Sequence, residues 1–557
     1  MLPFLLWTRN IRPEIHPIRK PSVATALLAC TFFYLTGRAF VPWLGLQNDE
    51  ALFGAALYDT SGLAMWRWVF GHKVPLMMMS YLGTLKTLLY APVFEIWPPA
   101  SNSIRLPMVL AGTATVWLFF ALLRRVSSVR AAVLGCLLLA TDATYLLTTC
   151  FDWGPVALQH LLLVGGGLLL VIFCQSRRLL PLAGGCLLFG LALWDKALFV
   201  WMLGGFSVAA VVVYPRQILH LVTFPRAIIA LAAFCAGALP FLLFNLNPQH
   251  RWETFRSNAS WTAGDLPGKA RMARFGLEGN ALFGWLVREN EEVATPQPAR
   301  TVCQRASFWL NGAAGGPRRS LQGWAFVAAL LLLPWLAFRQ GWQGEVRVLV
   351  FALVFLGVAW TQMALTRGAG GSAHHVVLLW PAPQLFIAVA LAAASRDVPR
   401  GALAAAALGC LLAVSNLLVV NHYYVLTVRN GGSLNWTDAV YPMARFVRQV
   451  PARQMFITDW GILDSLRLLD GPGLPLRVGT EAIGKPVLEA ADVASLHQQV
   501  SDPSNIFIGH TEGNEFFTGA RQKLLDNARS FGLRREMLTV VADRHGRPMF
   551  EVFRFVR

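Results

Sequence analysis

The sequence predicts a mainly α-helical fold: a polytopic membrane bundle of about 11 transmembrane helices, followed by a small extracytoplasmic α/β domain. Composition is the first observation behind this prediction, because 55% of the 557 residues are hydrophobic and only 14% are charged. Soluble globular proteins carry about 25% charged residues. The second observation is a series of apolar runs that recur up to residue 421, with lengths near the roughly 20 residues that a helix needs to cross a bilayer.

The candidate spans are separated by short polar turns or by longer loops. They cover residues 22–44, 104–123, 131–149, 154–174, 179–194, 197–214, 226–246, 323–338, 347–366, 375–394 and 401–421. Two stretches leave the count open. Pro75 to Phe94 is also apolar enough to span, and residues 181–214 fit either one long helix or two short helices separated by Asp195-Lys196.

The distribution of basic residues decides between these alternatives, because lysine and arginine are enriched in cytoplasmic loops. With eleven spans, only Lys196 and Arg367 fall in the short outer turns. The other basic residues of the short connections then fall on the inner side: Arg9, Arg12, Arg19, Lys20, Arg124, Arg125, Arg130, Arg177, Arg178, Arg216, Arg226, Arg339, Arg347, Arg396 and Arg400.

The eleven-helix arrangement fixes the sidedness of the chain. The N-terminus is predicted to be cytoplasmic, and the odd number of spans places the C-terminal domain outside a bacterial inner or cell membrane. Pro75 to Phe94 becomes an interfacial or re-entrant segment, with Lys73 and Lys86 near the lipid headgroups. The lipid bilayer is therefore the first predicted partner.

Charge and cysteine content exclude two other classes of protein. The net charge of +18 does not predict nucleic-acid binding, because the basic residues flank apolar runs and form no arginine-rich arm. The eight cysteines lie mostly inside apolar runs and form no CxxC motif. They are predicted to be packing residues and not a disulfide framework.

Three outer segments are long enough to carry structure of their own. The sequence predicts a transmembrane domain over 1–421, with outer loops at about 45–103 and 247–322, and a soluble domain over 422–557. In the last segment, strand-like runs such as Met455 to Ile457 and Asn505 to Ile508 alternate with helical patterns such as Phe516 to Ser530. This alternation predicts a small α/β domain.

Ionisable groups recur at four outer helix ends. They are Asp49-Glu50 after the first span, Asp152 after the third, Lys196 after the fifth and His374-His375 before the tenth. Each group alone fits a solvated helix start or an interfacial anchor. Because all four fall on one side of the membrane, we expect a single outward-facing cavity to collect them.

The order of these motifs resembles the GT-C superfamily of membrane glycosyltransferases. The likeness is closest to protein O-mannosyltransferases, lipid A aminoarabinose transferases and their bacterial relatives, and it covers roughly the first 420 residues. It rests on five motifs: Asp49-Glu50, Lys73-Val74-Pro75, Ser103 to Pro107, Asp152, and Gly190 to Lys196.

The resemblance implies an inverting enzyme with a polyprenyl-phosphate-linked sugar donor and an extracytoplasmic acceptor, which is a glycolipid, a polysaccharide or a protein. Asp49 is implied as the base that takes the acceptor proton. Glu50 and Asp152 are implied as further catalytic acids, with Asp152 positioning substrate or helping to bind a divalent metal ion. The departing phosphate would be bound by cations. The implied phosphate ligands are Lys73, Lys86, Arg105, Lys196, His374 and His375.

The sequence departs from the family pattern in two places. His374-His375 stands where an Arg-Tyr-like pattern is usual, and the C-terminal domain is unlike the β-trefoil inserts of eukaryotic mannosyltransferases. Two alternatives to a glycosyltransferase stay open: a membrane transporter or flippase, and a membrane-anchored binding protein of the cell envelope. A transporter would place ionisable groups near the bilayer midplane and show internal repeats.

Overall fold

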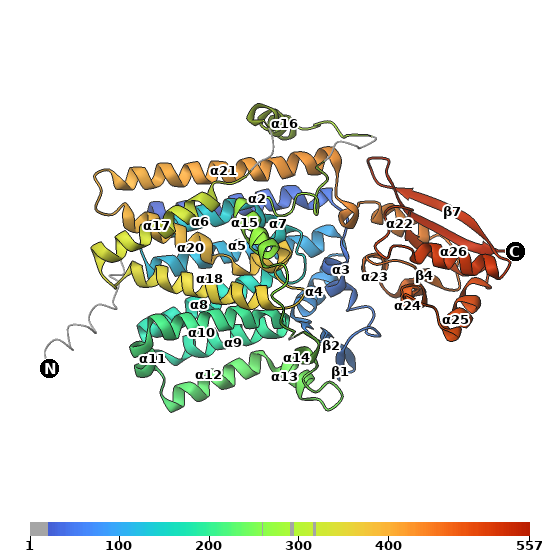
Figure 1. Cartoon of the computed structure of the whole chain (residues 1–557), viewed down its shortest axis with the longest axis horizontal. Coiled ribbons are helices and arrows are strands. Elements are labelled where there is room, and N and C mark those ends of the chain that lie inside the picture. Colours follow the sequence, from blue (N-terminus) through green and yellow to red (C-terminus); the bar gives the residue numbers. More distant parts are fainter. Residues whose placement is uncertain (1–19, 259, 290–294, 316–318) are drawn as a thin grey trace.

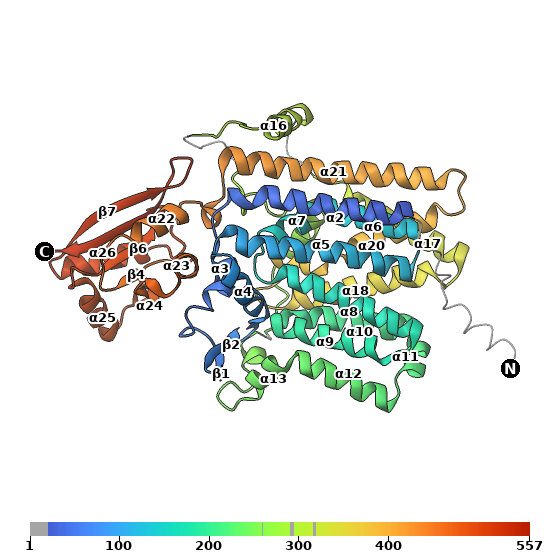
Figure 2. The same cartoon turned by 180° about the vertical axis from the view of Figure 1, so that it is seen from behind.

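The computed structural model describes residues 20–258, 260–289, 295–315 and 319–557. The predicted basic residues Arg9, Arg12 and Arg19 lie outside the described residues. The chain forms an elongated helical bundle with the C-terminal α/β domain mounted on one end (Figures 1 and 2).

Six helices of the bundle are long and apolar enough to cross a membrane. They are α2 (Lys20–Phe40), α5 (Ser101–Val126), α8 (Val156–Ser176), α17 (Gln322–Gln340), α18 (Glu345–Leu365) and α21 (Gly401–Asn430). The apolar helix α9 (Leu179–Asp195) is shorter, at 17 residues. Each of these helices coincides with a predicted span.

The remaining predicted spans are helix pairs that bend at a short break. They are α6–α7 (Val129–Thr141 and Ala143–Cys150), η3–α10 (Ala197–Phe199 and Val200–Val213) with α11 (Pro215–Leu221), α12–α13 (Phe224–Gly237 and Leu239–Leu246), and α19–η4 with α20 (Ala373–Val376, Val377–Leu379 and Ala382–Ala394). Together with the straight helices they confirm the predicted polytopic helical fold.

The bends have identifiable local causes. Pro240 stands in the first turn of α13 and Pro381 immediately precedes α20, and proline removes a backbone donor from a helix. Asp142 caps α7 by accepting a hydrogen bond from the Tyr145 amide. Its second carboxylate oxygen accepts hydrogen bonds from the amide nitrogens of Gln322 and Gln384, which ties the break to α17 and α20.

Polar contacts also join the helix ends that lie opposite the C-terminal domain (Figure 1). Glu345, at the start of α18, pairs with Arg396 after α20 and accepts a hydrogen bond from Ser127 after α5. Arg130 donates to the hydroxyl and carbonyl of Ser395. The helix α11, which carries Arg216, also lies at the end of the bundle opposite the C-terminal domain (Figure 1).

The first outer loop covers the other end of the bundle. It contains α3 (Asn48–Ala55), the sheet β1–β2–β3 (Met65–Val69, His72–Met79 and Leu82–Gly83) and α4 (Leu85–Ile96). Pro75 to Phe94 is thus part strand and part helix. With 12 residues, α4 is too short to span a bilayer core.

The second outer segment contains three short helices: α14 (Glu253–Asn258), α15 (Leu266–Glu278) and α16 (Val302–Ala314). The helix α16 runs beside α21, away from the rest of the bundle (Figures 1 and 2). Asn421 on α21 donates to the carbonyl of Ser307, and His422 contacts the side chain of Asn311.

The last membrane helix is longer than predicted, because α21 continues to Asn430 and does not end at 421. The C-terminal domain that follows is an α/β sandwich, as predicted. Its sheet has the order β5–β4–β6–β8–β7, with β5, β4 and β6 parallel and β8 and β7 antiparallel. The strands are β4 (Met455–Ile457), β5 (Leu476–Val478), β6 (Ile506–His510), β7 (Arg534–Ala542) and β8 (Pro548–Val556), and the main helices are α22 (Val440–Val447), α23 (Leu463–Asp470), α24 (Thr480–Ile483), α25 (Ala490–Val500) and α26 (Ala520–Ser530).

The C-terminal domain docks directly on the loop that carries Asp49. The Gly45 amide donates to the carbonyl of Trp436 at 2.9 Å, and Ser465 donates to the carbonyl of Leu46 at 3.2 Å. An added Cβ at Gly45 would lie 1.8 Å from the Thr437 carbonyl oxygen, so only glycine allows this approach. The domain therefore forms one wall of the region around α3.

Candidate active site

Asp49 lies in the first turn of α3, whose start is fixed by a capping box. Gln47 caps the helix: its side-chain oxygen accepts from the Asp49 amide, and the Glu50 carboxylate accepts from the Gln47 amide at 3.2 Å. This arrangement satisfies the free amides of the first turn. The Asp49 side chain is half-buried, and one of its oxygens accepts a hydrogen bond from Trp153 Nε1 at 2.9 Å.

Glu50 and Arg105 form a fully buried ion pair. Arg105 uses all five of its N–H donors: two bind the Glu50 carboxylate, and three bind the carbonyls of Val41, Leu44 and Gly45. The predicted catalytic role of Glu50 and phosphate-binding role of Arg105 stay predictions, and the geometry favours a structural role for both. Neither side chain is accessible, and together they hold α3 and the end of α2 against α5.

Lys86 and Asp152 form a second buried pair. Lys86 Nζ lies 2.6 Å from Asp152 Oδ2, and both side chains are buried. The other carboxylate oxygen accepts from the Ala157 amide at 3.0 Å, which fixes the start of α8. The charge of Lys86 is thus paired within the protein, and its predicted role in binding phosphate stays a prediction.

Lys196 is held by the first outer loop. Its backbone pairs with Leu82 in an antiparallel bridge, and the Ala197 amide donates to the Tyr81 carbonyl at 2.9 Å. An added Cβ at Gly83 would lie 1.9 Å from the Trp194 carbonyl oxygen, so this contact also requires glycine. Figure 2 shows β2 beside the outer end of α9.

The Lys196 ammonium group has no direct ionic partner among the described residues. Its side chain is 4% exposed, and no described residue forms a hydrogen bond or an ion pair with Nζ. Asp49, Asp195 and Asp152 all act on its charge from a distance. Of these three carboxylates, the half-buried Asp49 has the largest electrostatic effect on Lys196.

His374 and His375 lie in the short helix α19 and complete the cluster. The His374 ring packs on Trp153 with centroids 4.0 Å apart, and the Ser372 hydroxyl lies 3.1 Å from Nδ1 of both histidines. Trp153 thus connects Asp49 to the histidine pair, and Lys196 acts electrostatically on both rings.

One predicted site residue lies elsewhere. Lys73 is exposed near the tip of the β1–β2 hairpin, with Nζ 4.8 Å from the centroid of Trp66 and 5.7 Å from that of Trp68. Among the described residues no contact is found between Lys73 and Asp49 or Lys196, so the structure does not bring it together with the other predicted phosphate-binding cations.

Sequence reasoning missed two residues of the site. Trp153 is the group that joins the acidic and histidine motifs, and its position directly after Asp152 was the available signal. Lys269 on α15 is buried, donates to the Ala364 carbonyl, and acts electrostatically on His375. No local pattern in the sequence distinguishes Lys269 from the other basic residues of this loop.

The arrangement does not fit a divalent metal ion. The Asp152 carboxylate is occupied by Lys86 and by the Ala157 amide, and Lys196 adds positive charge beside Asp49. Across the described part of the chain, no group of three or more His, Cys, Asp or Glu side chains is placed to bind a metal. The structure therefore gives no support to the predicted role of Asp152 at a metal, and no step below uses one.

This chain forms a helical membrane bundle with an ionisable cluster under its first outer loop and a C-terminal domain on the same end. The arrangement is that of the GT-C fold. Three solved structures share this fold. ArnT from Cupriavidus metallidurans bound to undecaprenyl phosphate superposes with a TM-score of 0.58 and 12% identity, covering 95% of this chain and 97% of ArnT. ArnT in the apo state gives a TM-score of 0.55 over the same coverage, also at 12% identity.

The apo oligosaccharyltransferase of Archaeoglobus fulgidus is more distant, with a TM-score of 0.50 and 11% identity over 88% of this chain and 69% of that protein. No protein-family profile and no curated protein sequence matches the chain. The likeness is one of fold, and it confirms the GT-C architecture inferred from the sequence motifs.

Proposed function

We propose that this protein is a membrane glycosyltransferase that moves a sugar from a polyprenyl-phosphate-linked donor to an extracytoplasmic acceptor. The observation that carries the proposal is that two unlike side chains, Asp49 and Lys196, both lie beneath the first outer loop. Asp49 presents a half-buried carboxylate held by Trp153, and Lys196 presents a buried ammonium without an ionic partner. The Asp49 carboxylate is suited to accept a proton, and the Lys196 ammonium is suited to bind an anion.

In the proposed reaction, an acceptor hydroxyl or amine attacks the anomeric carbon of the donor sugar. A bond from the acceptor atom to that carbon forms as the bond from the carbon to the phosphate oxygen breaks, with inversion. Asp49 takes the acceptor proton, and the lipid phosphate leaves with the bonding electrons. Lys196 stabilises the negative charge that develops on this phosphate.

His374 and His375 are proposed to assist on the phosphate side, because the positive field of Lys196 reaches both rings. Imidazole N–H groups can donate hydrogen bonds to phosphate oxygens. The undecaprenyl phosphate bound to ArnT supports a ligand of this chemical class, since the two proteins share a fold over nearly their whole length.

Asp49→Asn tests the proposal, because asparagine keeps the shape of the side chain and an acceptor for Trp153 but cannot take a proton. We expect transfer from a polyprenyl-phosphate-linked sugar to fall by about 10²- to 10⁴-fold. The envelope glycolipids of a deletion strain carrying this variant should match those of the deletion strain itself.

Glu95→Gln is the matched control, because Glu95 is an exposed carboxylate of the same outer loop. It should transfer sugar at the parental rate. Equal thermal unfolding of the parent and both variants would show that the fold is intact. If Asp49→Asn transferred sugar as fast as the parent, the assignment of Asp49 as the base would be overturned.

A further inference from the structure

The β1–β2 hairpin ends in a tip whose side chains are bare. Every residue from Arg67 to Lys73 is exposed, including Trp68 at 63% and Phe70 at 98%. Single exposed apolar residues are common on proteins, but aromatic side chains gathered at one projecting tip are typical of an interaction surface. These residues belong to the first outer loop, and none takes part in the reaction proposed above.

The turn at this tip gives no structural reason for a phenylalanine. Phe70 and Gly71 form it between the paired residues Val69 and His72, with φ values of +47° and +80°. A turn with positive φ at both central residues is normally built from Asn-Gly or Asp-Gly. Bulky side chains rarely adopt a positive φ, and Phe70 gains almost no burial from the chain. The phenylalanine is therefore explained by something outside the chain.

The base of the hairpin packs on the outer ends of two membrane helices. Met65 and Met77 are buried in one cluster with Trp194 of α9 and Phe244 of α13. Trp194 Nε1 also donates to the Leu76 carbonyl at 2.8 Å. Both views show β1 and β2 beyond the outer ends of α9 and α13, at the rim of the bundle (Figures 1 and 2). The exposed tip therefore projects from the level at which these spans leave the membrane.

The lipid-facing surface of α13 leads up to this hairpin. Leu239, Leu243 and Leu246 are all exposed and lie at helical spacing on one stripe of α13. Leu246 is the last residue of the helix. An exposed leucine stripe on a spanning helix faces the acyl chains of the bilayer. The acyl chains therefore extend to the end of α13 that contacts β2, and the hairpin lies beside the boundary between lipid and water.

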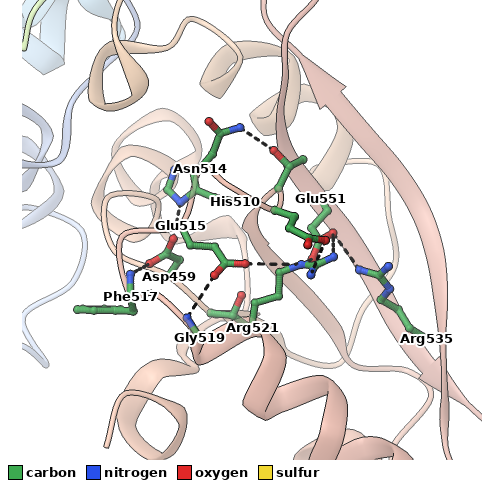
Figure 3. Close-up of polar contacts among 12 residues, drawn as sticks. Asp459, His510, Asn514, Glu515, Phe517, Gly519, Arg521, Arg535 and Glu551 are labelled. Atoms are coloured by element: carbon green, nitrogen blue, oxygen red, sulfur yellow. Dashed lines mark hydrogen bonds and ion pairs between the residues drawn. The ribbon is translucent and has the colours of Figure 1, made fainter. Parts of the chain in front are cut away.

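The charges of the first outer loop suit a layer of phosphates. Between residues 60 and 94 the sequence contains no Asp or Glu, and Arg67 forms no ion pair with a described residue. The C-terminal domain differs, because its basic residues face carboxylates: Arg521 and Arg535 both pair with Glu551, at 2.7 and 2.9 Å (Figure 3). A cationic surface without acidic residues is attracted to lipid headgroups, whereas a surface in water usually mixes both signs.

The strand pairing makes the hairpin amphipathic. Trp66 and Trp68 occupy one face, with their rings in edge-to-face contact at a centroid distance of 6.0 Å. Arg67 and His72 lie on the opposite face, because side chains alternate along a strand. The Lys73 ammonium lies over both tryptophan rings. Tryptophan with adjacent lysine or arginine is characteristic of the interface between membrane and water.

We propose that the β1–β2 hairpin docks on the outer lipid surface of the membrane. The Phe70 side chain and the Trp66–Trp68 face enter the boundary of the acyl chains, and Arg67 binds headgroup phosphates. Since β3, the strand after β2, pairs with the backbone of Lys196, this docking fixes the loop that covers the ionisable cluster against the lipid. It requires only that the bundle spans the membrane, and it holds whether or not Asp49 is the base.

The depth of the hairpin in a bilayer can be measured with a nitroxide label at Trp68. Replacing Trp68 with p-acetylphenylalanine keeps an aromatic ring and carries the label on its ketone, so the eight native cysteines stay unlabelled. The full-length protein is reconstituted in nanodiscs of phosphatidylcholine and phosphatidylglycerol. We expect the nitroxide to collide more often with oxygen, which concentrates in lipid, than with a water-soluble nickel chelate. The same label at Phe517, an exposed phenylalanine of the C-terminal domain, is the matched control and should collide more often with the chelate.

Phe70→Asn tests the contact itself, because asparagine suits the turn but has no apolar side chain. The oxygen-to-chelate ratio of the Trp68 label should fall several-fold in Phe70→Asn and stay at the parental value in Phe70→Trp. Arg67→Gln should also lower it in these nanodiscs. Thermal unfolding in detergent checks that each variant is folded. A Trp68 label as accessible to the chelate as the Phe517 label, or a ratio that Phe70→Asn leaves unchanged, would overturn the proposal.

Discussion

Replacing Arg105 by methionine tests whether this residue supports the fold or binds phosphate. Methionine is unbranched and apolar, so it fills much of the space of the arginine side chain while removing every donor. The change leaves the Glu50 carboxylate fully buried without a counter-ion. It also removes the donors of the carbonyls of Val41, Leu44 and Gly45.

The magnitude follows from this geometry. Removing one partner of a buried ion pair costs about 3–5 kcal/mol, because the remaining charge stays desolvated. The double variant Glu50→Gln with Arg105→Met removes that charge, so it should recover part of the loss. Complete recovery is not expected, since the three carbonyls still lack their donors.

The assay is equilibrium unfolding in mixed detergent micelles, followed by donor titration of the folded protein. Arg367→Met is the control, because Arg367 is an exposed arginine of the outer side. The structural interpretation predicts a loss of unfolding free energy for Arg105→Met and none for the control. An unchanged unfolding free energy together with a raised donor KM would refute it and restore the phosphate-binding role.

Three further outcomes are expected. Lys196→Ala should raise the donor KM about tenfold or more and leave the acceptor KM unchanged, with Lys73→Ala as a control without effect; an effect confined to the acceptor would argue against a phosphate role. Burial raises the pKa of Asp464, on the face of the C-terminal domain near Asp49, to about 6. The folded protein then holds a proton that the unfolded chain releases, so stability should fall by up to about 3 kcal/mol as pH rises from 4 to 6, and Asp464→Asn should flatten this profile in thermal unfolding. A reporter fused after Arg557 should be active outside the cytoplasm, and activity inside would contradict the eleven-helix arrangement.

The helices could be predicted from the sequence because hydropathy and length are local properties. Each predicted span matches a helix or a bent pair, even where a break such as Asp142 interrupts it. The β1–β2 hairpin was missed, because the run from Pro75 onward is as apolar as a membrane helix. What makes it a strand is its pairing with Met65–Val69, a partner that does not appear in a local window of sequence. The contact of the adjoining β3 with Lys196 is equally distant in sequence.

The site could be predicted only in part, for a related reason. The sequence indicates which ionisable residues stand at outer helix ends, but not which of them pair. Lys86 and Lys196 look equivalent in the sequence, yet only Lys86 finds a carboxylate, 2.6 Å away on Asp152. The family resemblance implies chemical roles for Glu50 and Arg105, whereas the five hydrogen bonds of Arg105 favour a structural role for both.

The unpaired charge of Lys196 is the strongest link between structure and proposed function. A buried ammonium without a partner is costly, and the chain has no structural need for one here: the β3 contact involves the backbone of this residue and not its ammonium group. Two other buried cations of this region are neutralised by a carboxylate, Lys86 by Asp152 and Arg105 by Glu50, and Lys269 donates to the carbonyls of Ala364 and Thr366. A cation that remains unpaired beside two completed pairs is best explained by an anion that arrives with the substrate, and the departing phosphate of a polyprenyl donor carries that charge.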